Sequence, residues 1–319
     1  MARCCLVSTA TAIKRLSRGS PLAPSFQRLP GCRPGRRGGN RALPQPFPAK
    51  RPLGTGYWVL GTGYWVLIYA KDMHRLLCVT AHPDDEAGNF GGSLLLYHER
   101  GVETHVICLT PGQAASNRGG ARTDQELATL RRKEFAASCQ VLKVTRGEVL
   151  DYADAHLHRI DLYSVVSELT RRMRQIRPQV VLSFGPEGGV TGHPDHGMAG
   201  IFASLAFQWA GRSNRFPEQL NDGTGPYRPQ KLYYAAAPFT LPNRQPISPP
   251  PATITINIGK FLEDKIRAFQ CHTSQAPLFP IFEGGVRQRG AQEEFHLAAT
   301  SSPGKLQPEE DLFQNVIAD

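Results

Sequence analysis

Two short runs of the sequence carry residue types that bind metal ions and transfer protons. Residues 82–86 read HPDDE and residues 192–196 read GHPDH. In the first run His82 and Asp85 stand three positions apart in a turn, which brings an imidazole and a carboxylate close enough to hold one cation. If His196 joins them, two imidazoles and one carboxylate surround a metal and leave one position for water, as in catalytic zinc sites.

Other interpretations of these runs are less specific. Asp84 adjoins Asp85, and two neighbouring carboxylates repel each other unless a cation or shared proton compensates, so Asp84 is expected to point elsewhere. Either run alone fits a simple turn or a helix N-cap. A second histidine pair, His156 and His158, has no carboxylate at ligand spacing and is expected to face solvent or pack locally.

The elements around the two runs predict where they lie. Short apolar runs alternate with helical patterns from residue 75 onwards, which indicates βαβ units and a mostly parallel sheet. Reactive groups in such α/β folds lie on loops at the carboxyl ends of strands, and both runs follow a predicted strand. Strands are expected over 75–81, 103–110, 148–150, 180–184, 231–235 and 253–258, and helices over 88–100, 123–142, 160–176, 193–209 and 260–272.

The motifs together resemble a known family. AHPDDE at 81–86, HPDH at 193–196 and HTSQ at 272–275 resemble the PIG-L/LmbE-like zinc-dependent N-acetylglucosaminyl deacetylases, over roughly residues 73–299. The last motif is expected either to support the site or to cap a helix. The resemblance implies a Rossmann-like, three-layer α/β fold with a mostly parallel sheet. It also implies hydrolysis of an N-acetyl or related amide on an amino sugar.

The resemblance further implies roles for the first run and its metal. His82, Asp85 and His196 match the family's zinc ligands, and Asp84 matches its general base. Amides are poor electrophiles, and Zn²⁺ both polarises a carbonyl and lowers the pKa of water. Zn²⁺ is therefore the expected cofactor, although Fe²⁺ also accepts two histidines and one carboxylate.

Proton transfer and substrate contact are implied in the same way. His193 matches the histidine that stabilises or protonates the tetrahedral intermediate, and Asp195 matches the carboxylate that orients it. Asp154 stands where family members place an acidic residue that binds sugar hydroxyls. Arg122, or Arg118 in the same Gly/Arg-rich loop, is a candidate for substrate contact. The alternative for both arginines is a solvated, flexible loop.

Several functions compete. The leading hypothesis is a zinc-dependent deacetylase that acts on a small amino-sugar glycoside, and an amidase of a thiol-glycoside conjugate is a close variant. A metal-dependent phosphoesterase usually needs two metals and more bridging carboxylates. A non-catalytic binding module would not need Asp84 and His193 beside a complete ligand set. A dinucleotide-dependent dehydrogenase is set aside because no G-x-G-x-x-G follows the first strand.

Charge and cysteine content narrow the partners. The chain has 319 residues and a formal net charge of +10, but residues 1–70 hold eleven of its 37 basic residues and none of its 27 acidic ones. The remainder is almost neutral and shows no bias towards nucleic acid. No apolar run reaches the roughly 18 residues of a membrane span. Seven cysteines without a C-x-x-C pair favour a reduced, cytoplasmic setting. Assembly into homo-oligomers is left open.

The ends of the chain are expected to lie outside the domain at 73–299. Residues 1–72 are predicted to be a disordered basic extension. GTGYWVL occurs at 54–60 and again at 61–67. A seven-base DNA unit repeated in tandem encodes such a protein repeat, because successive copies of the unit are read in each of the three reading frames. We therefore expect translation to start at Met73, over the alternatives of a targeting peptide or a basic interaction arm. Residues 300–319 are predicted to be a flexible tail.

Overall fold

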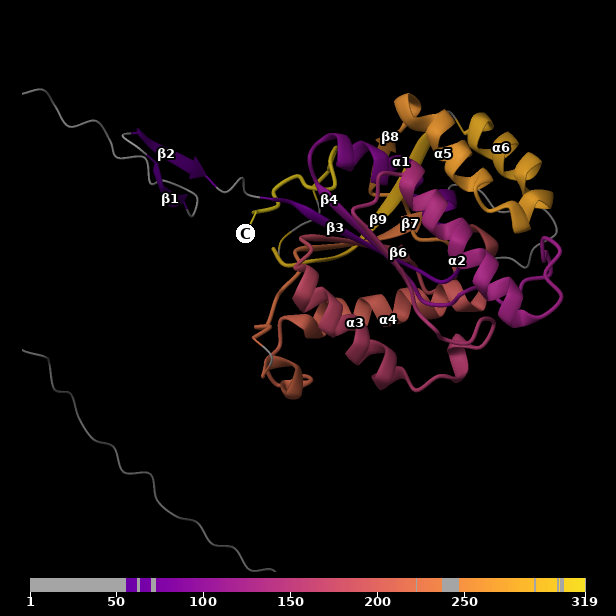
Figure 1. Ribbon diagram of the computed structural model, residues 1–319, viewed down its shortest axis with the longest axis horizontal. Helices are drawn as coiled ribbons and strands as arrows, with labels where there is room; N and C mark the ends of the chain where they lie inside the picture. Colours follow the sequence, from indigo (N-terminus) through magenta and orange to yellow (C-terminus); the bar gives the residue numbers. More distant parts are fainter. Residues whose placement is uncertain are drawn as a thin grey trace, which may run out of the picture. The chain divides into compact units, whose positions relative to one another are not determined.

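A seven-stranded sheet is the centre of the part of the chain that the computed structural model describes (Figure 1). The strand order is β5-β4-β3-β6-β7-β9-β8. The first five strands in this order run parallel to one another. Strand β9 is antiparallel to both β7 and β8. The bounds are β3 (Arg75–Thr80), β4 (Glu103–Cys108), β5 (Arg146–Val149), β6 (Val180–Phe184), β7 (Lys231–Ala236), β8 (Ile254–Asn257) and β9 (Gln292–Thr300). The described residues are 56–61, 64–69, 73–221, 223–236, 247–289, 291–302, 304 and 307–318.

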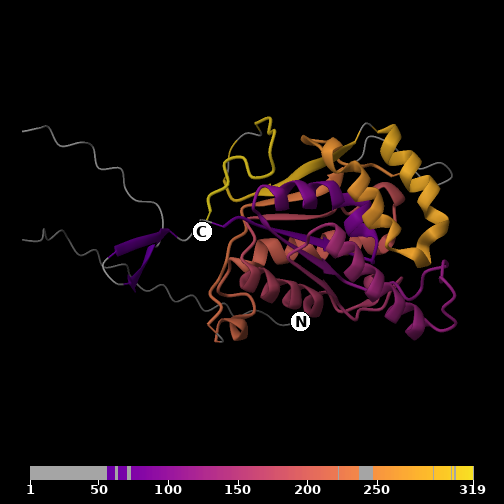
Figure 2. The same ribbon diagram turned by 45° about the horizontal axis from the view of Figure 1, so that its top comes forward.

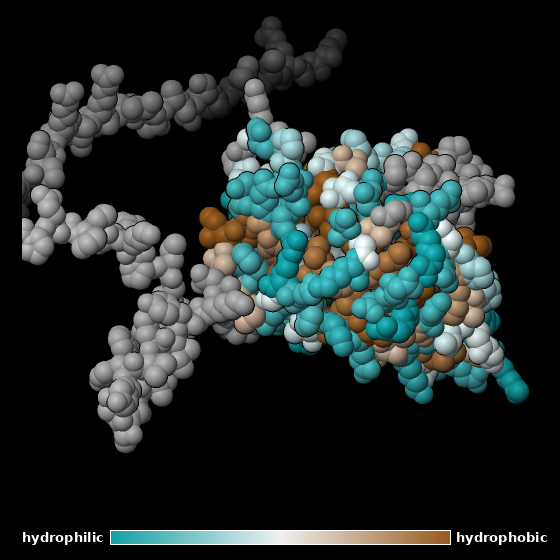
Figure 3. Space-filling model, turned by 90° about the horizontal axis from the view of Figure 1, so that it is seen from above, coloured by the Kyte–Doolittle hydropathy of each residue, from teal (hydrophilic) through white to brown (hydrophobic). Residues whose placement is uncertain are grey.

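Helices cover both faces of this sheet and complete a three-layer α/β fold (Figure 2). One layer holds α1, α2 and α5 with α6 beside α5, and the other holds α3 and α4, which pack on each other. The predicted Rossmann-like fold with a mostly parallel sheet is confirmed. Hydrophilic residues dominate the surface in Figure 3, with apolar ones between them. The helices are α1 (Asp85–Glu99), α2 (Asp124–Val141), α3 (Leu162–Ile176), α4 (Pro194–Ala210), α5 (Leu262–Gln270) and α6 (Phe279–Gln288).

The two chemistry-bearing loops meet because of the strand order. β3 and β6 are neighbours in the sheet, yet from β3 the chain continues to one side, through β4 and β5, and from β6 it continues to the other, through β7. The loops that follow β3 and β6 therefore lie side by side at the carboxyl ends of adjacent strands, where the chain direction across the sheet reverses. This is the usual ligand position in open α/β sheets. Both strands are almost wholly buried apolar runs, which fixes their ends firmly.

Within the domain predicted at 73–299, one helix and one strand were absent from the predicted list. Helix α6 and strand β9 follow the last predicted helix. The strand begins with Gln-Glu-Glu, which lacks the apolar alternation of a typical strand, but Glu293 has partners inside the protein. Its carboxylate accepts the backbone N–H groups of Gly92 and Ser93, each at 2.8 Å, and the ammonium of Lys265 at 2.5 Å.

Gly92 also shows why a glycine stands in α1. A Cβ atom at this position would lie 2.5 Å from Cδ1 of Ile258. The helix and the chain after β8 can approach this closely only because that atom is missing. Helix α1 itself begins at Asp85, three residues before the predicted start.

The C-terminal segment differs from the flexible tail expected for 300–319. Leu312 is fully buried, and its backbone N–H donates to the hydroxyl of Tyr97 at 2.8 Å. Glu309 accepts the ammonium of Lys231 at 2.6 Å and the hydroxyl of Tyr233 at 2.5 Å. An apolar side chain and a carboxylate near the end of the chain thus cover α1 and β7.

The predicted basic extension contains described backbone in two places. Strands β1 (Gly56–Gly61) and β2 (Tyr64–Tyr69) pair as an antiparallel hairpin within the repeat. Tyr, Trp and Val favour extended backbone, so this part differs from the disorder expected for 1–72. The remaining residues up to 72 lie outside the described part. Among the described helices, none is long and apolar enough to cross a membrane.

Candidate metal centre and active site

The predicted ligands converge on one point. Nδ1 of His82 lies 3.3 Å from Nε2 of His196, although the two residues are 114 positions apart. The carboxylate of Asp85 lies 3.1 Å from that same His196 nitrogen and 3.7 Å from Nδ1 of His82. Donor atoms of a tetrahedral zinc site stand roughly 3.4 Å apart. The three donor atoms therefore have the spacing that a single cation requires.

Asp85 is held by the backbone at the start of α1. Its Oδ2 accepts the N–H groups of Ala81 at 3.1 Å and His82 at 2.9 Å. Burial opposes ionisation of this carboxyl, but His196, His82 and the backbone donor outweigh it and hold its pKa below the usual range. Asp85 is therefore an ionised carboxylate in a fixed orientation, as the predicted ligand role requires.

His82 is held from the side away from His196. Its Nε2 lies 3.0 Å from Asp154 and 3.6 Å from Asp195. The other oxygen of Asp154 accepts the N–H of Ala114 at 2.8 Å, and this side chain is only 6 % exposed. Asp154 was expected to bind sugar hydroxyls, but both of its oxygens are engaged inside the protein. Burial tends to raise its pKa, yet His82 and Ala114 lower it to about 2.

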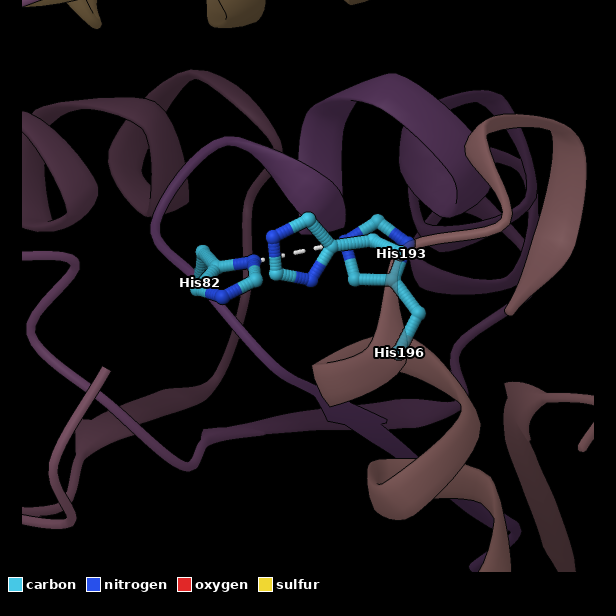
Figure 4. A group of neighbouring side chains, drawn as sticks. All are labelled: His82, His193 and His196. Carbon is cyan, nitrogen blue, oxygen red and sulfur yellow. Dashed lines mark hydrogen bonds between the residues drawn. The ribbon is translucent and has the colours of Figure 1, made fainter. Parts of the chain in front are cut away.

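His193 stands at the mouth of the site. It caps the N-terminus of α4, its ring lies edge-on to His82 at 4.8 Å between centroids, and its ring centroid lies 5.2 Å from that of His196 (Figure 4). Burial, together with His82 and His196, lowers its pKa, which favours a neutral ring. Its Nδ1 accepts the backbone N–H of Asp195 at 3.2 Å. A neutral ring with an accepting Nδ1 carries its proton on Nε2.

Asp195 does not orient His193 in the expected way. The bond to His193 comes from the Asp195 backbone, whereas its carboxylate accepts the N–H of Leu157 at 3.2 Å. Its second oxygen, Oδ2, is buried without a hydrogen-bond partner among the described residues and lies nearest His82. The carboxylate of Asp195 therefore faces His82, a predicted ligand, and does not contact His193 as the orienting role predicted.

Asp84 is directed away from its neighbour, as its position beside Asp85 predicts. Its φ is +113°, a left-handed conformation that costs energy for a residue with a side chain. Its Oδ2 lies 2.8 Å from Nη2 of Arg131. The other terminal nitrogen of that guanidinium, Nη1, donates to the carbonyl oxygen of Gly112 at 3.0 Å. Burial raises the pKa of Asp84 to about 6, while Arg131 pulls it down.

A buried polar cluster holds the backbone of Asp84. From the sequence, His272 in the HTSQ motif was expected either to support the site or to cap a helix, and no role was assigned to Glu86 or Ser138. The Glu86 carboxylate accepts the backbone N–H of Asp84 at 3.0 Å, the hydroxyl of Ser138 at 2.6 Å and Nε2 of His272 at 2.7 Å. Glu86 and His272 are both fully buried. A signal was available: a third acidic residue inside a buried stretch must have partners, since an unpaired buried charge is costly.

The two candidate arginines make other contacts. Arg118 pairs with Asp124 at 2.9 Å, at the N-terminus of α2. Arg122 is exposed, and its backbone N–H donates to Glu126 at 2.7 Å. The structure gives neither guanidinium a contact with the converged residues, so a substrate contact of Arg122 stays a prediction.

The donor set fits a divalent cation. Two groups of side chains have ligand atoms within 4.8 Å of one another, and His82 belongs to both: with His193 and His196, and with Asp154 and Asp195. The first group, with Asp85 beside it, offers imidazole nitrogens and a carboxylate, which are ligands that Zn²⁺ accepts. The second holds the opposite edge of the His82 ring, as second-layer carboxylates do at metal centres.

Comparison with known proteins places this site in a family. The family described as GlcNAc-PI de-N-acetylase, PIG-L, matches residues 77–207. The chain is 30% identical over 208 residues to the diacetylchitobiose deacetylase of Thermococcus kodakarensis, covering 65% of this chain and 72% of that protein. The chain belongs to the PIG-L family. The match to the family includes both loops of the site.

Two further relatives illustrate the range of the PIG-L family. A mycothiol S-conjugate amidase from Streptomyces coelicolor is 31% identical over 182 residues, covering 51% of this chain and 61% of that protein. The solved structure of the N,N'-diacetylchitobiose deacetylase from Pyrococcus horikoshii has a TM-score of 0.59 and 25% identity, and covers 71% of this chain and 84% of that one. The chain is thus a hydrolase of a family whose relatives are named for amide cleavage.

Proposed function

We propose that this PIG-L family chain is a zinc-dependent deacetylase that removes the acetyl group from an N-acetylglucosaminyl glycoside. The observation that carries the proposal is the convergence of His82, Asp85 and His196 from two loops, with Asp84 beside them and engaged elsewhere. The similarity to diacetylchitobiose deacetylases supports an amino-sugar substrate. The Zn²⁺ would be held by these three residues and would polarise the amide carbonyl and activate a water for attack.

The chain's own residues then handle the protons. Asp84 accepts the proton of the attacking water, because its carboxylate is next to the ligands and Arg131 holds it in one orientation. Nε2 of His193 donates to the developing oxyanion, because Nδ1 is occupied by the backbone of Asp195. The departing amine needs a proton, and the one held by Asp84 is positioned to return to it. Asp154 and Asp195 keep the ring of His82 in place throughout.

Acetate release tests this function directly. Purified protein with its metal retained is incubated with N-acetylglucosamine glycosides, with Asp84→Asn as the control, and metal content is measured in both. The proposal expects acetate from the wild type only and similar metal content in the two proteins. Absence of acetate release from a wild-type protein that holds one metal per chain would overturn it.

An amidase of thiol-glycoside conjugates is the second candidate. The similarity to a mycothiol S-conjugate amidase favours it, and the same residues would cleave that amide. A parallel assay with such a conjugate separates the two candidates, because the deacetylase releases acetate and the amidase releases a larger acid.

We also propose a cytoplasmic location. Four described cysteines, Cys78, Cys108, Cys139 and Cys271, are free thiols. Free thiols persist in reducing compartments. Fractionation of cells that express the chain from its own gene tests this, and recovery outside the cytoplasm would contradict it.

A further inference from the structure

A second cavity lies at the opposite end of the sheet from the metal centre. It encloses about 460 Å³. Its walls include Arg75, Glu103 and Arg146, the first residues of β3, β4 and β5, and the last turn of α3. The metal centre follows the carboxyl ends of the strands, so this cavity at their amino ends is a separate site.

Positive charge is concentrated in this cavity. The rest of the chain after residue 70 is almost neutral, yet four guanidinium groups line the cavity against two carboxylates. The carboxylate of Glu148 is engaged, because Arg172 donates to it at 2.7 and 3.1 Å. The four arginines are Arg75, Arg146, Arg172 and Arg177, and the two acids are Glu103 and Glu148. Arg172 also pairs with Glu168 at 3.0 Å, so the positive excess that remains for a ligand is small and favours an anion with few charges.

His105 adds unused hydrogen-bonding capacity on β4. Both of its ring nitrogens are buried and have no hydrogen-bond partner among the described residues. Burial lowers its pKa; Glu103 raises it, Arg146 and Arg75 lower it further, and the net direction is downward. The neutral ring offers one N–H donor and one acceptor. Buried polar atoms are normally satisfied, and a bound ligand would satisfy these.

We propose that this cavity binds a compact organic phosphate. Guanidinium groups form the planar pairs of hydrogen bonds that phosphate oxygens accept, and His105 supplies a further donor. Val106, Ile107 and Ile176 line the same cavity and give the organic part an apolar surface. The volume falls within the 300–1,000 Å³ or so of small-molecule sites. A polymeric polyanion fits this site less well, because the charge of the chain after residue 70 is almost balanced.

Calorimetric titration of the full chain with ribose 5-phosphate at about 150 mM salt tests the proposal, with ribose as the uncharged control. We expect a dissociation constant below about 1 mM for the phosphate and no heat from ribose. Arg146→Glu should weaken binding at least about tenfold, as loss of a charge-assisted contact predicts. Lys143→Glu makes the same charge change three positions away on an exposed residue outside the cavity and should weaken it less than about twofold.

Three results would overturn the proposal: no binding by the wild type, equal binding of ribose, or equal weakening by the two charge reversals. If Arg146→Glu fails to fold by circular dichroism, His105→Leu takes its place, with the same tenfold expectation. Acetate release by Arg146→Glu should equal that of the wild type. Equal release would show that this substitution leaves the metal centre intact. The calorimetric titrations do not use acetate release, so their outcome does not depend on the proposed function.

Discussion

The two loops that form the metal centre are held in different ways. The loop after β3 is fixed by buried side-chain charges. Glu86 accepts a hydrogen bond from the backbone N–H of Asp84, and Arg131 forms an ion pair with the carboxylate of Asp84. The loop after β6 is fixed by its backbone. Gly188, Gly189 and Gly192 all have positive φ, at 82°, 61° and 60°.

This difference predicts which kind of substitution should disrupt each loop. In the second loop, the backbone N–H of Gly188 donates a hydrogen bond to the carbonyl oxygen of Gly185 at 3.0 Å, and that of Gly192 donates to Gly189 at 3.1 Å. Nδ1 of His196 lies 3.2 Å from the carbonyl oxygen of Gly188. Added side-chain atoms should damage this loop, whereas lost charges should damage the first. The loop that presents the proposed base is therefore the one supported by buried charge.

Replacing the proposed base should have the largest effect on activity. Asp84→Asn removes proton acceptance but keeps the shape, so kcat should fall about 10²–10⁴-fold while zinc content stays near that of the wild type. Acetate-release kinetics and metal analysis on the same sample measure both. Asp151→Asn, at an exposed carboxylate, is the control. Zinc loss as large as in His196→Ala would contradict the separation of base from ligands.

Breaking the charge support of the first loop should have the largest effect on stability. Glu86→Gln leaves the imidazole of His272 without its buried carboxylate, so the free energy of unfolding should fall by about 3–5 kcal/mol. Glu99→Gln, on the same helix, removes only an exposed pair with Lys260 and should cost about 1 kcal/mol or less. Denaturant unfolding measures both. Equal losses would mean that the loop does not depend on buried charge.

The second loop should respond to a single methyl group. A Cβ at Gly188 would lie 2.5 Å from the carbonyl oxygen of His193, and its φ of 82° is unfavourable for alanine. Gly188→Ala should therefore lower the free energy of unfolding by about 1–3 kcal/mol. Gly223→Ala is the control, because its φ of 85° is equally unfavourable but, chain neighbours aside, no described residue has an atom within 4 Å of the added group. A loss no greater than the control's would show that close contact does not matter there.

The support of His82 should affect metal affinity. Asp154→Asn keeps the bond from Ala114 possible but removes the charge beside His82, so zinc affinity should fall about 10–100-fold. Competition with a chelator measures it. If catalysis of the loaded variant falls and zinc affinity does not, Asp154 contacts substrate, as the sequence predicted.

The smallest expected effect is on pH dependence. Burial lowers the pKa of His272, but Glu86 and Asp84 together outweigh it, and the net direction is upward from 6.5. A raised pKa in the folded state gives stability that is complete below the unfolded value and is lost as the pH rises through the folded one. The loss of stability in His272→Gln should thus be larger at pH 6 than at pH 9. Denaturant unfolding at both values tests this, and a difference that grows with pH would contradict it.

The sequence predicted the strands and helices that carry His82 and His196, because β3 and β6 are buried apolar runs with clear ends. It missed β9, because the acidic start of that strand is satisfied only by Lys265 and by the N–H groups of α1. Such partners lie far away in sequence, and no local pattern reveals them.

The site shows the same division. Residue types and spacing paired His82 with Asp85 and left His196 as a third candidate, which the family resemblance then implied; the structure brings the three together. They could not reveal that Asp154 and the carboxylate of Asp195 face His82, since hydrogen-bond direction depends on the folded backbone. A short motif can state which groups meet, but not which atom of each group is used.

The 114-residue separation of His82 and His196 has a consequence for folding. Bringing these residues together requires closing a long loop, and the entropy of that closure must be offset by the sheet that forms between them. Contacts between such distant positions form slowly compared with local ones. Neither loop alone can therefore make the ligand set, and a chain released before β6 has joined β3 has no metal centre.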